Sequence, residues 1–221
     1  MHTLYSILTS LLLNLTLSGC SNPTEQTVVV DPKQALEQGY ELATFAGGCF
    51  WCTEAVFERV IGVKDVVSGY TGGKEKNPTY GQVSYGETSH AEAIQIYYDP
   101  KIISYDKLLD IFFATHDPTQ VNRQGPDVGA QYRTEVFYHD AAQKEATEKY
   151  IAQLNSEGKY DKPIATKVSE YSEFWLAEAY HQNYYELNPG NPYIINIAVP
   201  KVRKFKKYFP ELVKEQYQAE K

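Results

Sequence analysis

The sequence predicts an α+β fold, a two-layer sandwich of helices on a sheet. Its 221 residues are 43% hydrophobic and 22% charged, which suits one domain with a substantial core. The first six predicted elements follow the order β-α-β-β-α-β, which is the split βαβ or ferredoxin-like arrangement. The sequence contains no internal repeat and no sign of a second domain. An additional strand and C-terminal helices are therefore expected to extend one core.

The first half of the predicted core holds three strands and one helix. The strand segments are apolar or β-branched, and the helix segment has apolar residues at helical spacing. The segment before the third strand is rich in Gly, Thr, Ser and Asn, and a loop of this length inside a compact domain is usually functional. The predicted elements are strands over 40–46, 63–70 and 91–98, a helix over 50–60 and a loop over 71–89.

The second half adds capped helices and two further strands. Ser104 and Asp140 can each accept a hydrogen bond from the first turn of the helix that follows, and Gln143 stands at the capping-box position after Asp140. A second long loop spans 117–130. The predicted elements are helices over 104–116 and 140–155, strands over 131–138 and 164–170, and C-terminal helices over 175–187 and 201–208.

The first 20 residues form an apolar segment without a charged side chain. Its stretch from Leu4 to Leu17 is short for a membrane span and is typical of a signal-peptide core, although no Lys or Arg precedes it. The segment ends in Leu17-Ser18-Gly19-Cys20, which resembles the bacterial lipoprotein signal that is cut before a lipidated cysteine. We therefore expect a signal peptide over 1–19. A plain secretory signal and a buried N-terminal helix are the alternatives.

Residues 20–38 are polar, contain two prolines and show little periodicity. We expect them to form a flexible tether that is lipid-anchored at Cys20. Ser21 resembles the residue that directs such proteins to the outer membrane rather than the inner one. The expected location is therefore the bacterial cell envelope, facing the periplasm. A catalytic domain is expected over 39–212 and a C-terminal tail over 213–221.

Two further cysteines stand at the start of the first predicted helix. Cys49 follows a glycine pair and falls in the first turn, where the helix dipole favours the thiolate that acts as nucleophile. Cys52 lies one turn later, near enough to form a disulfide with it. Such a disulfide would stabilise little by chain entropy, so a redox pair is the better interpretation. Two buried apolar cysteines remain the alternative, and no second CxxC or His pair supports a metal site.

Glu92 lies on the predicted strand 91–98, on the face of Ile94, Ile96 and Tyr98. A carboxylate on an apolar face is costly to ionise, so the pKa of Glu92 should rise. A carboxylic acid that keeps its proton near neutral pH can serve as a general acid. The alternative is a partly open sheet face on which Glu92 is solvated.

Aromatic and acidic residues near these groups are weaker candidates. Phe50 and Trp51 could form an apolar cage for a small group on a substrate, or could be ordinary core aromatics. Tyr80, Asp127 and Tyr132 lie in the two long loops or at their edges. The chain contains 19 tyrosines, which suit a site that is part dry and part hydrogen-bonding. The histidines form no recognisable triad.

A series of short motifs occurs in order between residues 40 and 200. The motifs are Gly48-Cys49-Phe50-Trp51, Ser68-Gly69-Tyr70-Thr71-Gly72-Gly73, His90-Ala91-Glu92-Ala93, Tyr97-Tyr98-Asp99-Pro100, His116-Asp117-Pro118-Thr119-Gln120, Asn122-Arg123-Gln124-Gly125, Asp127-Val128-Gly129 and Gln131-Tyr132-Arg133. In order and spacing they resemble those of peptide methionine sulfoxide reductases of the A type. The resemblance implies thiol-dependent reduction of methionine (S)-sulfoxide, in proteins and as the free amino acid, and so repair of oxidised proteins.

The resemblance also implies a role for each candidate residue. Cys49 would attack the sulfoxide sulfur and end as a sulfenic acid, while Glu92 would protonate the sulfoxide oxygen. No metal or organic cofactor is implied, and a thioredoxin-like or other dithiol donor would recycle the enzyme. The remaining residues would bind substrate: Tyr80 and Tyr132 at the oxygen, Phe50 and Trp51 at the methyl group, and Asp127 through water or the substrate backbone.

The chain departs from many members of that family in its second cysteine. Those members carry a resolving cysteine in a C-terminal tail, whereas here no cysteine follows Cys52, at a position where the family often has Gly. We therefore expect Cys52 to resolve the Cys49 sulfenic acid as a disulfide. Reduction by an external thiol, with Cys52 as a bystander, is the alternative.

Two other classes of function stay open. A general thiol–disulfide oxidoreductase would use the CxxC pair alone and leave Glu92 and the tyrosines without a task. A non-enzymatic surface-binding protein would need none of these residues. The net charge of −7 argues against a nucleic-acid binder, and the basic cluster over 201–207 is expected to be a solvated helix face. We expect a monomer.

Overall fold

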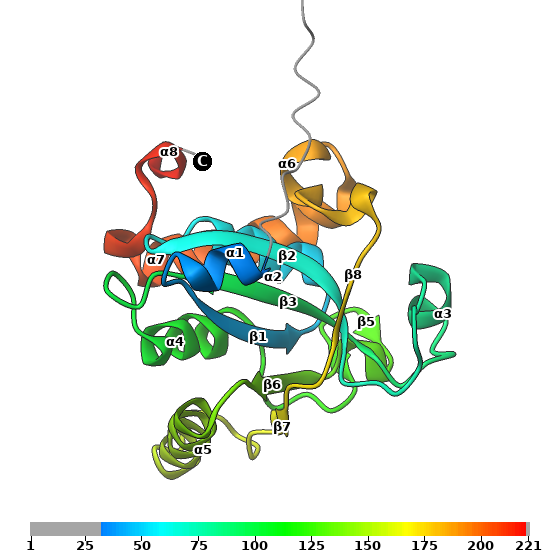
Figure 1. Cartoon of the computed structure of the whole chain (residues 1–221), viewed down its shortest axis with the longest axis horizontal. Coiled ribbons are helices and arrows are strands. Elements are labelled where there is room, and N and C mark those ends of the chain that lie inside the picture. Colours follow the sequence, from blue (N-terminus) through cyan, green and yellow to red (C-terminus); the bar gives the residue numbers. More distant parts are fainter. Residues whose placement is uncertain (1–31, 220–221) are drawn as a thin grey trace, which may run out of the picture.

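The computed structural model describes residues 32–219, which form a six-stranded sheet with helices packed mainly on one face (Figure 1). The α+β class predicted from the sequence is therefore confirmed. Two short strands in the second long loop form a separate ribbon, β4 (Arg123–Gln124) and β5 (Asp127–Val128). The strands of the large sheet are β1 (Glu41–Gly47), β2 (Val63–Thr71), β3 (Ala91–Tyr98), β6 (Thr134–Tyr138), β7 (Lys167–Glu170) and β8 (Phe174–Leu176).

The large sheet has the strand order β7-β6-β1-β3-β2-β8. Its neighbouring strands are antiparallel, except for the parallel pair β6 and β7. β3 pairs with β1 on one side and with β2 on the other, and all eight of its residues are buried. Glu92 therefore lies on a central strand whose residues are all buried.

The main core lies between one sheet face and the long helices. Phe45, Ile94 and Ile96 project from that face into the core. The opposite face is covered in part by α1 (Pro32–Glu37), whose Ala35 packs against Val67 and Tyr97. In Figure 1, α1 lies in front of the sheet and α7 behind it, so a partial third layer corrects the predicted two. The core helices are α2 (Phe50–Glu58), α4 (Tyr105–Thr115), α5 (Ala141–Ser156) and α7 (Val199–Tyr208).

Short helices fill the connections between these elements. They are α3 (Tyr80–Ser84), the 3-10 helices η1 (Ala130–Tyr132), η2 (Ala179–His181) and η4 (Pro210–Leu212), α6 (Tyr184–Leu187), the π-helix η3 (Ile194–Ala198) and α8 (Glu215–Gln218).

The predicted helix caps at Ser104 and Asp140 are confirmed. Each side chain accepts a hydrogen bond from the backbone N–H three residues on, at Lys107 and at Gln143. The expected reciprocal bond of a capping box does not form at α5. The Gln143 side chain instead accepts from the His139 N–H and donates to the Leu42 carbonyl, which ties α5 to β1.

The helix predicted over 175–187 is wrong. Trp175 pairs with Tyr70 in the edge strand β8, and Asn183 has a left-handed φ of 53° that separates η2 from α6. Pairing with the free edge of β2 outweighs helical spacing in this segment. Two predicted strands also begin later than expected: β6 follows the 3-10 turn η1, and β7 starts at Lys167 where pairing with β6 begins.

Within the described residues, packed structure extends past both predicted domain boundaries. The predicted tether 20–38 already contains α1, because burial of Ala35 fixes it to the sheet. The predicted tail begins at Val213, which is 2% exposed and bridges to Val60. The signal peptide over 1–19, the lipidated Cys20 and the rest of the tether lie outside the described residues.

Candidate active site

A cavity of about 220 Å³ lies beside the first turn of α2. Its lining residues are Cys49, Phe50, Trp51, Tyr80, Glu92, Asp127, Tyr132 and Tyr193. The structure therefore brings together every residue predicted for attack, protonation and substrate binding, and adds Tyr193. The predicted resolving residue, Cys52, does not line the cavity; it is fully buried and packs beside Cys49.

The backbone turn at Gly48 places Cys49 at the N-terminus of α2. Gly48 has a φ of +91°, and a Cβ atom built there would lie 2.6 Å from the side chain of Gln124. Gln124 is itself held by two hydrogen bonds to the backbone of Asp117. Cys49 is the N-cap residue of α2, its sulfur makes no capping bond, and 6% of the residue is exposed. The thiol is thus presented to the cavity from a rigid turn.

The two thiols share their protons. Both cysteines are free of disulfide bonds in this structure. Burial raises the pKa of Cys49 well above its usual range, and the neighbouring Cys52 and Glu92 raise it further. A hydrogen bond from Cys49 and, to a smaller extent, the charge of Lys201 lower the pKa of Cys52 to about 7, despite burial. Burial and the nearby Glu92 therefore oppose ionisation at the Cys49 sulfur, against the expected effect of the helix dipole, and the two thiols titrate as a coupled pair.

Glu92 has the environment that the strand pattern predicted. It is 2% exposed, and burial raises its pKa to about 8. One carboxyl oxygen, Oε2, accepts a hydrogen bond from the Phe50 N–H at 3.1 Å, which holds the group beside the first turn of α2. Near neutral pH Glu92 therefore keeps its proton in a cavity that also holds a thiol.

Two tyrosines on separate loops face the same carboxyl group. Burial, followed by the charge of Glu92, raises the pKa of Tyr80 to about 12 and the pKa of Tyr132 still higher. Both phenols therefore remain O–H donors at physiological pH. Tyr132 is carried by η1, and Tyr80 is the first residue of α3.

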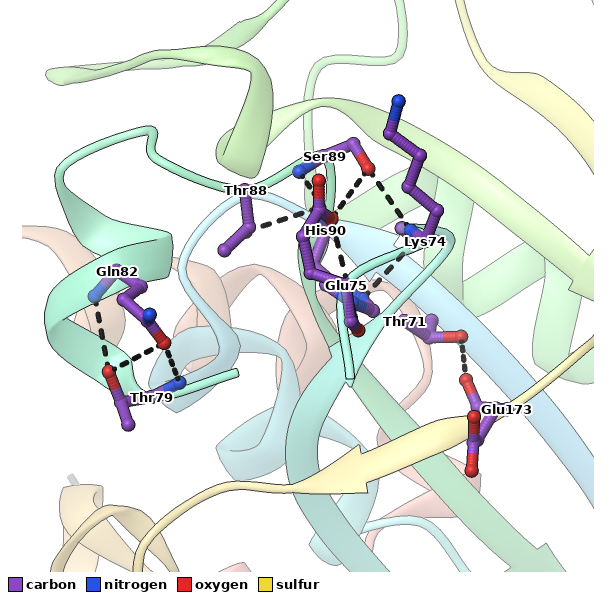
Figure 2. Close-up of polar contacts among 10 residues, drawn as sticks. Thr71, Lys74, Glu75, Thr79, Gln82, Thr88, Ser89, His90 and Glu173 are labelled. Carbon is purple, nitrogen blue, oxygen red and sulfur yellow. Dashed lines mark hydrogen bonds and ion pairs between the residues drawn. The ribbon is translucent and has the colours of Figure 1, made fainter. Parts of the chain in front are cut away.

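Hydrogen bonds within the first long loop position Tyr80 (Figure 2). Thr79 and Gln82 form a complete capping box at the start of α3. Glu75 accepts two hydrogen bonds from Ser89, and these lower the pKa of Glu75 to about 2. The same end of α3 is also tied to the C-terminal half of the chain, because the Tyr80 N–H donates to Glu178 at 2.9 Å. The loop that looked irregular in sequence is thus ordered around the cavity.

Trp51 is held by residues from the C-terminal half. Its ring stacks on Tyr184 with a centroid separation of 3.7 Å and an angle of 7°, and its Nε1–H donates to Nδ1 of His181 at 3.0 Å. Burial lowers the pKa of His181 to about 4, so the imidazole stays neutral and keeps its role as acceptor. These contacts fix the indole as one wall of the cavity.

Tyr193 is the lining residue that sequence reasoning missed. Its hydroxyl donates to Oδ2 of Asp127 at 2.6 Å, and its ring meets Trp51 edge-on. Burial raises the pKa of Asp127, while the hydrogen bond from Tyr193 and the charge of Lys201 oppose that change. The abundance of tyrosine was the one sequence signal for this contact, and it could not single out a position.

A larger hollow of about 1040 Å³ lies beside the second long loop. Asp117, Arg123, Lys159 and Lys204 are among its lining residues. No cysteine lines it, and hydrogen bonds from Gln120 and Thr119 lower the pKa of its Asp117 in spite of burial. The smaller cavity is therefore the better candidate for redox chemistry.

Comparison with known proteins agrees with this chemistry. The profile of the family described as peptide methionine sulfoxide reductase matches residues 41–213. The chain belongs to this family. The predicted resemblance and the predicted enzyme class, a peptide-methionine sulfoxide reductase, are confirmed.

Relatives and solved structures share most of the domain. Peptide methionine sulfoxide reductase MsrA 1 of Rhodopirellula baltica is 53% identical over 176 residues, 80% of this chain and 91% of that protein. MsrA 2 of Synechocystis is 47% identical over 193 residues, 87% of this chain and 90% of that protein. Reduced Mxr1 of Saccharomyces cerevisiae superposes with a TM-score of 0.64 at 36% identity, over 75% of this chain and 92% of that one.

Two further observations concern residues 32–219 only. None of their helices is long and apolar enough to cross a membrane. No group of three or more His, Cys, Asp and Glu side chains in this part of the chain is placed to hold a metal ion.

Proposed function

We propose that this enzyme reduces the S epimer of methionine sulfoxide, in oxidised proteins and as the free amino acid, at Cys49. The observation that carries the proposal is that a protonated carboxyl group and the Cys49 thiol line one cavity, with the second thiol, Cys52, packed beside Cys49. Glu92 keeps its proton near neutral pH, while the adjacent thiol pair loses its first proton at about pH 7. Sulfoxide oxygen leaves poorly until it is protonated, so both states are required at once.

In the first half of the proposed cycle, the Cys49 sulfur attacks the sulfoxide sulfur. Its proton passes to the Cys52 thiolate, and Glu92 delivers a proton to the oxygen. The oxygen ends on Cys49 as a sulfenic acid, the two electrons of the Cys49 thiol having reduced the substrate to methionine. Hydrogen bonds from Tyr80 and Tyr132 would hold the oxygen during this step, since both phenols stay protonated.

The proposed substrate pocket uses the remaining lining residues. Phe50 and Trp51 would enclose the methyl group, because the stacked and hydrogen-bonded indole offers a fixed apolar wall. Asp127 would bind the substrate backbone, directly or through water, with its carboxylate oriented by Tyr193. No metal or organic cofactor takes part.

In the second half, Cys52 would attack the Cys49 sulfenic acid. The S–S bond forms, the S–O bond breaks, and the oxygen leaves as water. Close packing of the two cysteines and their shared hydrogen bond support this step. A thioredoxin-like or other dithiol donor would then reduce the disulfide.

The test of the main proposal is a dithiothreitol-driven assay on the separated sulfoxide epimers, free and within a peptide. The S epimer should be consumed and the R epimer should not. Cys49→Ser should abolish turnover, and Glu92→Gln should reduce it strongly. Turnover of the R epimer alone would overturn the assignment. A general thiol–disulfide oxidoreductase, the second candidate, would reduce a model disulfide and leave both sulfoxides intact.

The role of Cys52 is tested by one turnover without reductant. The wild type should release one methionine and lose both thiols to a disulfide. Cys52→Ser should release the same methionine but retain a Cys49 sulfenic acid, which dimedone would trap. Trapping of equal sulfenic acid in the wild type would show that Cys52 is a bystander.

The remaining proposals concern the location and the fold. We propose that the chain is a monomer, anchored to the bacterial envelope by lipid on Cys20 and facing the periplasm. The sequence Leu17-Ser18-Gly19-Cys20 supports the anchor, and mass spectrometry of the mature N-terminus would test it. We also propose a ferredoxin-like core, which the antiparallel strand order β6-β1-β3-β2 supports.

A further inference from the structure

We propose that Lys201 is a positioning residue for the closing steps of the cycle: its ammonium group stabilises negative charge on the Cys52 sulfur. This inference rests on the proposed resolving role of Cys52. It gives one member of the basic cluster over 201–207, predicted to be a solvated helix face, a task inside the protein.

The placement of Lys201 follows from the helix that carries it. The π-helix η3 runs directly into α7, and its residues Ile194 and Ala198 pack in one cluster with Cys49 and Cys52. Lys201 stands three residues after Ala198, and residues three apart share a helix face. The lysine side chain therefore starts one turn beyond the contact with the cysteine pair.

The ammonium group itself lies close to the turn before Cys49. A Cβ atom built on Gly48 would be 3.9 Å from Lys201 Nζ. Lys201 is half-buried, and within residues 32–219 it forms no ion pair with a carboxylate. A charge in this position is only partly screened by water, so it acts on its neighbours more strongly than a surface lysine does.

The charges around the cysteine pair show why a cation matters there. Glu92 of β3 and Asp127 of β5 are acidic groups that oppose a thiolate, whereas the hydroxyl of Tyr193, the residue before η3, favours one. Tyr80 and Tyr132 also line the cavity and stay neutral. After the hydrogen bond from Cys49, the positive charge of Lys201 also lowers the pKa of Cys52, and the same charge lowers the pKa of Asp127.

The chemistry needs this charge at two points. When Cys52 attacks the sulfenic acid, its sulfur carries negative charge until the S–S bond forms and water leaves. When a dithiol donor attacks the Cys49 sulfur of the disulfide, the S–S bond breaks and Cys52 leaves as a thiolate. A better-stabilised thiolate leaves faster, so the same ammonium group assists both steps.

The test separates the two halves of the cycle with the full chain. Reduced enzyme is mixed with one equivalent of methionine (S)-sulfoxide, and methionine release and thiol loss are followed separately. Lys201→Met should form the disulfide about 3- to 10-fold more slowly near pH 7, as expected for removal of one nearby charge. Methionine release should slow by less, because in that step Cys52 only accepts the Cys49 proton. The difference should disappear well above pH 8, where Cys52 ionises unaided.

Two matched variants separate the charge at position 201 from the charge of the rest of the helix. Lys201→Arg should retain wild-type disulfide formation, and Lys207→Met, which removes an exposed charge from the same helix, should change nothing. Absorbance of the thiolate near 240 nm, titrated against pH, should move upward in Lys201→Met alone. Unchanged titration and unchanged disulfide formation in Lys201→Met would overturn the inference. Failure of the wild type to release methionine would refute the proposed function instead, while the titration still reports on Lys201.

Discussion

Glu92 shows how a single buried carboxyl group sets the pH range of the reaction. Burial raises its pKa to about 8, so the acid form that protonates the sulfoxide persists at pH 7 and is lost at higher pH. We predict that methionine release in a single turnover falls as pH rises through about 8. A carboxyl group with the ordinary pKa of 4.5 would lose this activity below neutrality, and a profile of that kind would contradict the assignment.

The matched variant Glu92→Gln should lack that alkaline fall and be about 10²- to 10⁴-fold slower, the usual contribution of a general acid. Stability provides a second measurement. Between pH 4.5 and about 8 the folded protein binds the Glu92 proton more tightly than the unfolded chain, so its free energy of unfolding declines as pH rises through this interval. Glu92→Gln should show less decline, whereas the exposed control Glu87→Gln should behave as the wild type.

At the residue scale, the sequence could predict the groups that belong to local patterns. Cys49 was marked by its glycine pair, and Glu92 by alternation along a strand that proved to be buried at every position. Tyr193 and Lys201 belong to no such local pattern, because only the packing of the C-terminal helices against α2 brings Tyr193 to the cavity and Lys201 to the turn at Gly48. The protonation of the thiol pair was also out of reach, since it depends on burial.

At the scale of elements, the turn from β1 into α2 must keep a glycine at position 48. We predict that Gly48→Ala lowers stability by roughly 1–3 kcal/mol, because its φ is +91° and its Cβ would collide with Gln124. The displaced turn should also reduce methionine release. Gly158→Ala is the control, since that glycine has a positive φ but open space around it. Its loss should be about 1 kcal/mol, without a change in activity. If Gly48→Ala and Gly158→Ala changed activity equally, the predicted clash with Gln124 would not be the cause.

Helices and strands could be predicted where the residues that favour them locally also agree with the contacts made by distant segments. Ser104 and Asp140 cap helices as expected, because a cap is satisfied within four residues. The segment 174–187 was not predictable, because its first residues complete the sheet edge beside β2, far away in the chain. The same kind of long-range contact, from Ala35 to Val67 and Tyr97, moved the start of the domain into the predicted tether.

At the scale of the whole molecule, Arg59 at the end of α2 contacts two helices from the C-terminal part of the chain, α6 and α8. Arg59 is fully buried, and its guanidinium lies between the rings of Tyr185 and Tyr217, 4.6 Å and 4.5 Å from their centroids. It also pairs with Glu186 and donates to the Ala55 carbonyl. The segment predicted to be a C-terminal tail is therefore held at the end of α2, where Tyr217 stacks on the Arg59 guanidinium.

We predict that Arg59→Met destabilises the domain by about 2–3 kcal/mol. Removal of one partner from a buried ion pair costs more than this, but Glu186 is 37% exposed and can be hydrated after the change. The measurement is urea unfolding at neutral pH, followed by tryptophan fluorescence, since Trp51 stacks on Tyr184 next to the arginine-bound Tyr185. Arg203→Met removes an equal charge from an exposed position and should shift stability by less than about 0.5 kcal/mol. Equal midpoints for the two variants would mean that the C-terminal segments are held by apolar packing alone, and that the buried arginine only fills space between two rings.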